Sequence, residues 1–285
     1  MSNVRAIQTA LISVYYKDGL EPLVRALHAR NVEIFSTGGT QQFIESLGIP
    51  VHTVEGLTGY ASILGGRVKT LHPKVFGGIL ARREEMNDIN DLAAYDIPTL
   101  DLVIVDLYPF EETVASGATH ADIIEKIDIG GISLIRAGAK NHKEVVILSS
   151  KDQYARLLSQ LESQNGTTLE ERITYATEAF AVSSYYDSTI FNYFNRNEKL
   201  QVLRLVSNDA LPLRYGENPH QAGSFYGKLD DVFEILNGKQ LSYNNLLDVD
   251  AAVNLLADFD EPTFAVIKHN NACGLASRPT VLQAW

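Results

Sequence analysis

The chain has 285 residues, a net charge of -11 and 45% hydrophobic residues, which is typical of a globular protein with about two domains. The acidic balance argues against a nucleic-acid partner, yet it permits a small anionic ligand held by a few local cations. The longest apolar runs are far shorter than the roughly 18 residues of a membrane span, and the opening MSNVRAIQ lacks an apolar signal-peptide core. The single cysteine, Cys273, excludes an intrachain disulfide. We therefore expect a cytosolic protein with no membrane partner.

Short apolar runs alternate with amphipathic stretches along the first half of the chain. The pattern predicts buried strands at 9–16, 32–37, 100–110 and 144–150, and helices at 20–30, 40–48 and 120–128. This alternation of strands and helices predicts an α/β fold with a mainly parallel sheet that is covered on both faces.

The pattern changes after residue 150. Residues 151–195 are mostly helical in pattern, and their aromatic residues are interpreted as core or subunit contacts. The pattern weakens over 196–209, where we place a domain boundary, and a turn-rich segment with strand-like runs begins at Leu211. The sequence stops at Trp285 before this second set of elements is complete, so we expect a truncated second domain.

Polar clusters lie where predicted strands end or helices begin. They comprise Ser13 and Lys17, then Ser36 to Thr40, then Asp106 to Tyr108, and finally Asp128 to Gly131. Carboxyl ends of parallel strands form the ligand crevice of such sheets, and Gly-rich turns at helix N-termini bind phosphate. We therefore expect an anion site at this edge of the sheet.

Known nucleotide, metal and nucleophile motifs do not match. STGGT is not G-x-G-x-x-G, and GGRVKT has Val68 where a P-loop requires glycine. No histidine pair has H-x-x-x-H spacing and no G-x-S-x-G is present, so neither a metal site nor that type of hydrolase is expected.

The stretch LGGRVKTLHP holds two flexible glycines, an arginine, a lysine and a histidine within ten residues. Arg67 and Lys69 alternate around Val68, so in an extended segment their side chains point the same way. Either an anion or solvent separates two such charges, and the segment alone leaves both interpretations open.

Three other candidates also have ordinary structural interpretations. Tyr108 precedes a proline and could pack at a strand end. Asp128 could cap the helix that follows it, and Lys140 could be a surface charge near a helix C-terminus.

Seven stretches occur together in the order found in one protein family. They are STGGT, LGGRVKTLHP, FGGILARR, DLYPF, EKIDIGGISLIRAGAKNH, LRYGENPHQ and VIKHNNACG. From about Leu11 onward the chain closely resembles the bifunctional purine-biosynthesis family, in which phosphoribosylaminoimidazolecarboxamide formyltransferase is joined to IMP cyclohydrolase. The resemblance implies a methylglyoxal-synthase-like cyclohydrolase domain over 1–205, with a core to about 150 and a helical extension over 151–205. Residues 206–285 then correspond to the opening part of a cytidine-deaminase-like transformylase domain.

The resemblance also implies site residues. The catalytic positions are Lys69, Tyr108, Asp128 and Lys140 for the cyclohydrolase, and Lys268 and His269 for the transformylase. The nucleotide-binding positions are Ser13, Lys17, Thr37, Gly38, Gly39, Thr40, Arg67, Val68, Thr70, Asp106, Leu107, Ile129, Gly130 and Gly131, with Arg214 and Tyr215 in the transformylase.

The implied roles follow from ring closure of a formamide onto a neighbouring carboxamide. Asp128 takes the amide proton and Lys140 shuttles a proton at the departing oxygen, while Lys69 and Tyr108 stabilise the oxyanion. In the transformylase, His269 takes a proton from the attacking amine and Lys268 protonates the folate nitrogen. Because adjacent strand residues point opposite ways, this pair needs a turn or bulge, which we expect within 270–274.

The resemblance implies purine ribotides and 10-formyltetrahydrofolate as ligands, no metal or cofactor for the cyclohydrolase, and a homodimer. The chain departs from the family pattern at Tyr15 and Tyr16 (usually Ser-Asp), Asp106 (usually Asn) and Ala272 (usually Pro). Two alternatives to the cyclohydrolase stay open. One is a nucleotide-binding regulatory module of the same fold, and the other is a methylglyoxal synthase, which does not explain LRYGENPHQ.

Overall fold

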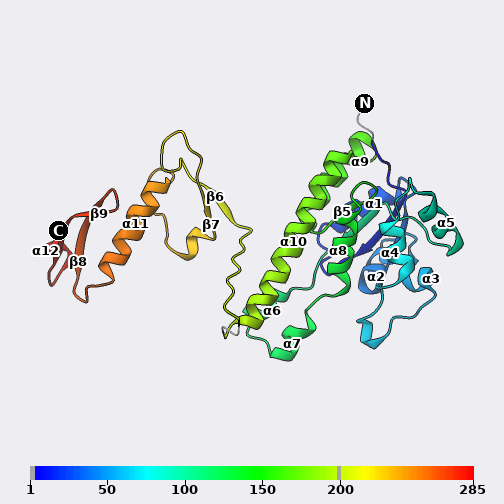
Figure 1. Ribbon diagram of the computed structural model, residues 1–285, viewed down its shortest axis with the longest axis horizontal. Helices are drawn as coiled ribbons and strands as arrows, with labels where there is room; N and C mark the ends of the chain where they lie inside the picture. The colour runs from blue at the N-terminus through cyan, green and yellow to red at the C-terminus, as the bar shows by residue number, and fades with distance from the viewer. Residues whose placement is uncertain (1–3, 198–199) are drawn as a thin grey trace. The chain divides into compact units, whose positions relative to one another are not determined.

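A computed structural model describes residues 4–197 and 200–285 of the chain (Figure 1). Contacts divide it into two compact units, Met1–Arg204 and Leu205–Trp285. Residues 198–199, within the expected boundary segment, and residues 1–3 of MSNVRAIQ lie outside the described residues.

The first unit is built on a parallel five-stranded sheet with the order β3-β2-β1-β4-β5. The strands are β1 (Thr9–Ser13), β2 (Glu33–Ser36), β3 (His52–Thr53), β4 (Leu102–Val105) and β5 (Val146–Leu148). At the centre, Leu11 of β1 pairs with Phe35 on one side and Val103 on the other. Ala10, Leu11 and Ile12 are all fully buried, and because successive side chains alternate between faces, both faces of the sheet are covered. The predicted parallel α/β fold is confirmed.

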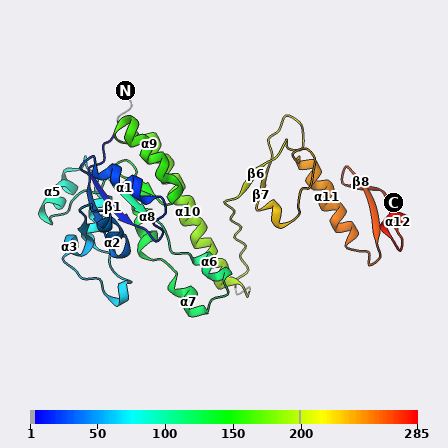
Figure 2. The same cartoon turned by 180° about the vertical axis from the view of Figure 1, so that it is seen from behind.

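Helices connect and follow these strands, and Figure 2 shows them from the opposite side. They are α1 (Leu20–His28), α2 (Gly38–Ser46), α3 (Val54–Thr58), α4 (Pro73–Leu80), α5 (Met86–Ala94), α6 (Phe110–Ala115), α7 (His120–Glu125), α8 (Gly130–Lys140), α9 (Tyr154–Gln164) and α10 (Leu169–Asn195), with short 3₁₀ turns η1 (Leu64–Gly66) and η2 (Lys151–Gln153). Helix α1 packs on α9, whereas α8 packs on β4 and β5 and also contacts α4 and α10.

Several elements differ from the sequence expectation. The strand expected over 9–16 ends at Ser13, because the N–H groups of Tyr15 and Tyr16 bond the Asp106 carboxylate instead of a neighbouring strand. Helix α2 begins at Gly38, two residues before the expected start. Helix α4 was not predicted, although Pro73 occupies its first turn and His72 Nδ1 accepts the Lys74 N–H at 3.1 Å.

The helix α10 carries the aromatic residues that the sequence assigned to core or subunit contacts. A capping box of Thr168 and Glu171 starts the helix. Tyr175 is fully buried in the main core, while Tyr186 joins a smaller cluster with Phe110 and Ile123. The core interpretation therefore holds for Tyr175 and Tyr186.

The second unit contains two antiparallel hairpins and helices. Its elements are β6 (Ala210–Pro212), β7 (Ser224–Tyr226), η3 (Leu229–Asp231), α11 (Tyr243–Leu256), β8 (Thr263–Lys268), β9 (Asn271–Ser277) and α12 (Val281–Ala284). Among the described residues, no helix combines the length and apolar character needed to cross a membrane.

Two adjacent glycines in α4 provide a test of how tightly this helix packs. A Cβ at Gly78 would lie 2.3 Å from the Pro98 backbone oxygen, whereas one at Gly77 would meet only the movable end of Ile97 at 3.1 Å. We expect Gly78→Ala to lower the free energy of unfolding by about 1–3 kcal/mol, since backbone must shift. Gly77→Ala is the matched control and should change it by less than about 1 kcal/mol. Denaturant unfolding measures both, and equal losses would contradict this packing.

Candidate active site

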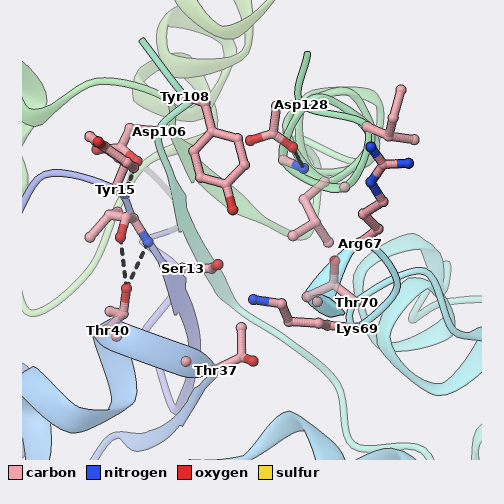
Figure 3. Close-up of a pocket in the computed structure, with 18 of the residues that line it drawn as sticks. Ser13, Tyr15, Thr37, Thr40, Arg67, Lys69, Thr70, Asp106, Tyr108 and Asp128 are labelled. Carbon is pink, nitrogen blue, oxygen red and sulfur yellow. Dashed lines mark hydrogen bonds between the residues drawn. The ribbon is translucent and has the colours of Figure 1, made fainter. Parts of the chain in front are cut away.

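A pocket of about 720 Å³ opens at the carboxyl ends of β1, β2 and β4 (Figure 3). Strand β1 leads through α1 to β2 on one side and has β4 on the other side, so the strand order reverses between β1 and β4. Such a switch point is where open parallel sheets bind ligands. The pocket therefore lies at the edge that the polar clusters predicted.

Most of the expected cyclohydrolase residues line this pocket. Those that do are Ser13, Lys17, Thr37, Gly38, Gly39, Thr40, Arg67, Lys69, Thr70, Asp106, Tyr108, Asp128, Ile129, Gly130 and Gly131. Val68, Leu107 and Lys140 are not among the lining residues. Val68 instead pairs with Ile63 across the loop, and Leu107 packs against the hydrophobic clusters.

The N-terminus of α2 forms one wall of the pocket. Thr37, Gly38 and Gly39 present the first turn of this nine-residue helix. The Thr40 hydroxyl accepts the Val14 N–H at 3.0 Å and donates to the Val14 oxygen at 2.8 Å, which joins the helix to the end of β1. The helix dipole and the free N–H groups of the first turn make this wall suitable for an anion.

Lys69 lies beside that wall. A Cβ on Gly38 would be 3.6 Å from Lys69 Nζ, and one on Gly66 would be 3.0 Å from Lys69 Cε. Because these glycines have no side chain, the Lys69 side chain can lie between the loop and the N-terminus of α2. Gly66 also has a φ of 92°, which disfavours any other residue.

The expectation that Arg67 and Lys69 share a face is wrong. Arg67 has helical backbone angles (φ -67°, ψ -23°) instead of extended ones, so the two side chains diverge in Figure 3. Arg67 forms a two-point ion pair with Glu125 at the end of α7, while Lys69 points into the pocket. The repulsion between the two cations is thus relieved by a carboxylate that the sequence analysis did not single out.

Tyr108 and Asp128 face each other across another part of the pocket. Figure 3 shows the Tyr108 hydroxyl directed into the cavity and the Asp128 carboxyl next to the ring. Burial, and then the charge of Asp128, raise the pKa of Tyr108. Burial also raises the pKa of Asp128, against the opposing effect of the N–H groups of Gly131 and Tyr108.

Asp128 also has the capping contact that the sequence left open. Its Oδ1 accepts the Gly131 N–H in the first turn of α8 at 2.6 Å. The same carboxyl lines the pocket, so Asp128 both caps α8 and belongs to the candidate site.

The turn after β1 is held by Asp106, one of the departures from the family pattern. Its carboxylate accepts the N–H groups of both Tyr15 and Tyr16, the latter at 2.9 Å. Burial raises the pKa of Asp106, and burial lowers the pKa of the neighbouring Lys17. The Lys17 ammonium folds back onto the carbonyl oxygens of Val14 and Tyr15. The added negative charge therefore serves the backbone of this turn.

Aromatic rings and a lysine form the rim next to Asp106. The rings of Tyr15 and Tyr108 meet edge to face at 5.6 Å, and Lys126 Nζ lies 5.6 Å and 5.8 Å from their centroids. Cation–π contacts of this length are weakly stabilising at exposed sites. Sequence reasoning missed Glu125 and Lys126, because charged residues on a short helix normally indicate only a solvated face.

Lys140 lies at the other end of α8 from the pocket. The eleven residues of α8 span about 16 Å. Lys140 is exposed in the last turn, where a cation is favourable beside the helix C-terminus. Within the described chain, the structure does not bring Lys140 together with Asp128.

The expected transformylase residues lie in the second unit. Lys268 ends β8, and His269 and Asn270 form the β8–β9 turn with φ values of 52° and 63°. The turn thus starts one residue before the expected segment 270–274, and a register shift between Val266 and Ile267 precedes it. Arg214 lies over the Tyr215 ring at 4.9 Å.

Comparisons with known proteins agree with this architecture. A family model described as the MGS-like domain matches residues 19–133, and one described as the AICARFT/IMPCHase bienzyme matches residues 138–285. The bifunctional purine biosynthesis protein PurH of Bacteroides thetaiotaomicron is 62% identical over 286 residues, covering 100% of this chain and 56% of that protein. PurH of Rhodopirellula baltica is 47% identical over 295 residues, with coverage of 100% and 56%. A solved structure described as the crystal structure of ForH matches with a TM-score of 0.58 and 34% identity, covering 66% of this chain and 97% of that chain.

The parallel sheet, its switch-point pocket and these matches define an MGS-like domain followed by part of a second enzyme domain. The chain belongs to the AICARFT/IMPCHase bienzyme family, in which the PurH proteins are its relatives. It spans about 56% of the length of the PurH relatives described above. The resemblance found in the sequence is thereby confirmed.

The Asp106 carboxylate gives a direct test of the turn after β1. An asparagine offers one acceptor oxygen, so its NH₂ group would face one of the two N–H groups. We expect Asp106→Asn to lower the free energy of unfolding by about 1–3 kcal/mol, the cost of a lost charged hydrogen bond. Asp18→Asn removes the same charge from an exposed position in this segment and should cost less than about 0.5 kcal/mol. Denaturant unfolding at neutral pH compares them, and equal stability of the two variants would refute the bracing role.

Proposed function

We propose that this chain is an IMP cyclohydrolase, which closes the ring of 5-formamidoimidazole-4-carboxamide ribotide and releases water to give IMP. The observation that carries the proposal is the meeting of Lys69, Tyr108 and Asp128 in one pocket beside the N-terminus of α2. A phosphate-binding helix end with groups able to hold or move protons is what a ribotide-converting enzyme needs.

The phosphate of the ribotide would lie on the first turn of α2. The N–H groups from Gly38 to Thr40 and the dipole of α2 would stabilise its negative charge. The base would then extend along the pocket toward Tyr108 and Asp128. The remaining lining residues, Ser13, Thr70, Ile129 and Gly130 among them, would surround the ribose and base.

Ring closure requires one new bond and the movement of two protons. The carboxamide nitrogen attacks the formyl carbon, and an oxyanion forms on the formyl oxygen. Asp128 accepts a proton from the nitrogen, while the Tyr108 hydroxyl and the Lys69 ammonium stabilise the oxyanion. The oxygen gains two protons, one that came from the carboxamide nitrogen and one from the former formamide N–H. The C–O bond then breaks to release water, a C=N bond forms, and the ring becomes aromatic.

The required rate enhancement is within reach of these side chains. Nucleophile and electrophile belong to one molecule, so the substrate supplies most of the proximity effect. A positioned acid or base adds about 10²–10⁴-fold, roughly 3–5 kcal/mol. The proposal therefore needs no metal or cofactor at this site.

The second unit would belong to the transformylase of the whole protein. We propose that Lys268 and His269 move protons during formyl transfer from 10-formyltetrahydrofolate and that Arg214 and Tyr215 hold the nucleotide. A homodimer located in the cytosol is part of the same proposal, which rests on the family relationship.

Asp128→Asn tests the proposed base. We expect kcat for ring closure to fall by at least about 10²-fold, the low end for a positioned acid or base. Because burial raises the pKa of Asp128, wild-type activity should decline on acidification at a higher pH than an ordinary aspartate would give, and the variant should lack this acid limb. A spectrophotometric ring-closure assay across pH measures both effects.

Lys140→Ala is the comparison variant for that experiment. Lys140 lies outside the described pocket, so a loss equal to that of Asp128→Asn would show that it reaches the site through a contact not made within one chain. A wild-type chain that binds IMP without turnover would support the regulatory module and contradict the cyclohydrolase.

Lys69→Ala tests the oxyanion role and the ligand contact of its loop. We expect kcat to fall by about 10²–10³-fold, as for loss of an oxyanion donor, with a smaller change in IMP affinity. In the wild type, IMP should slow hydrogen exchange of residues 64–73. Unchanged exchange at saturating IMP would mean that the loop is ordinary surface.

A further inference from the structure

Tyr186 joins α10 to the turn that carries Asp128. Its hydroxyl accepts the Asp128 N–H at 2.7 Å and donates to the Lys126 carbonyl oxygen at 3.0 Å. Both capacities of the hydroxyl as donor and acceptor are therefore used on the backbone between α7 and α8. The residue lies about 60 positions away in sequence, so only the tertiary fold brings it to the turn.

The Tyr186 ring is itself held in place. It is 8% exposed, and it meets the Phe110 ring edge to face at 6.2 Å in the cluster that also includes Ile123. Phe110 starts α6 and Ile123 lies on α7, so helices on the rim side fix the ring. Because the ring is buried and packed, its hydroxyl has a fixed position and restrains the backbone groups to which it is hydrogen-bonded.

The turn held by Tyr186 carries two side chains that reach the pocket or its rim. The Asp128 carboxyl lies against Tyr108, and the Lys126 ammonium lies over the rings of Tyr15 and Tyr108. A shift of the turn would move both groups relative to the Tyr108 hydroxyl. The position of the turn therefore sets the geometry of the reacting groups.

We propose that Tyr186 is a positioning residue for ring closure, acting through the backbone of Lys126 and Asp128. This inference rests on the proposed cyclohydrolase function. It assigns to the long helix α10, whose residues lie outside the segment matched by the MGS-like model, a direct part in the site's geometry. Burial raises the pKa of Tyr186 to about 12, so the hydroxyl stays protonated and can donate at any assay pH.

Tyr175 provides a matched control on the same helix. It is also buried, and its hydroxyl bonds Gln160 Oε1 at 2.8 Å, a contact with α9 instead of the pocket. Tyr175→Phe and Tyr186→Phe each remove one buried hydroxyl from α10. A purely structural role would give the two variants similar effects.

The test compares both variants in the 285-residue chain at a temperature where each is folded by circular dichroism. We expect Tyr186→Phe to lower kcat for ring closure about tenfold with KM changed by less than about threefold, because misplacement by about 1 Å can cost up to 10²-fold. The acid limb of its pH profile should move to lower pH, because a looser turn exposes Asp128 to water. Tyr175→Phe should keep the wild-type kcat and acid limb.

A second measurement does not depend on activity. Hydrogen exchange of the peptide covering residues 126–131 should be faster in Tyr186→Phe than in the wild type and unchanged in Tyr175→Phe. If the two variants match in kcat, acid limb and exchange, Tyr186 is only a core residue and the inference fails. If the wild type does not close the ring, the proposed function fails, and the exchange comparison alone decides whether Tyr186 holds the turn.

Discussion

The first unit depends on the parallel pairing of β1 with β2 on one side and β4 on the other. Ala10, Leu11 and Ile12 are buried on both faces of the sheet, and this burial fixes the register of β1 against its neighbouring strands. A shift of one residue would move each of these side chains to the opposite face. Parallel pairing directs the carboxyl ends of all three strands to one edge. The chain must leave that edge through turns, and the backbone groups exposed there are what the site is made from.

Polar groups at this edge serve the backbone and the pocket together. The Thr40 hydroxyl bonds the N–H and the carbonyl oxygen of Val14. The Asp106 carboxylate accepts the N–H groups of Tyr15 and Tyr16, which follow Val14. Asp128 similarly bonds the first turn of α8 while its carboxyl faces the cavity. Partly buried carboxyls with raised pKa values thus line the same pocket as the N-terminus of α2, a helix end suited to an anion.

The helix α10 links the site to the rest of the first unit. It packs against α8 and β5 and bonds the turn before α8 through Tyr186. The turn between α7 and α8 lies outside the strands of the sheet, and the Tyr186 hydroxyl supplies two backbone hydrogen bonds to it. In sequence Tyr186 looks like any aromatic core residue, and only the contacts of its hydroxyl distinguish it from Tyr175.

The sequence alone determined the parallel α/β fold and placed Tyr108 and Asp128 near one edge of the sheet, whereas Lys69 was added by the family resemblance. Strand–helix alternation and strand ends are local properties, so a pattern can show them. The tertiary structure decided that Arg67 pairs with Glu125 and that Asp106 accepts two backbone N–H groups. It also decided that Lys140 lies outside the pocket and that the Tyr186 hydroxyl bonds the turn before α8. Each depends on backbone angles in a turn or on residues far apart in the chain. The direction of a side chain is set by packing, which local pattern does not contain.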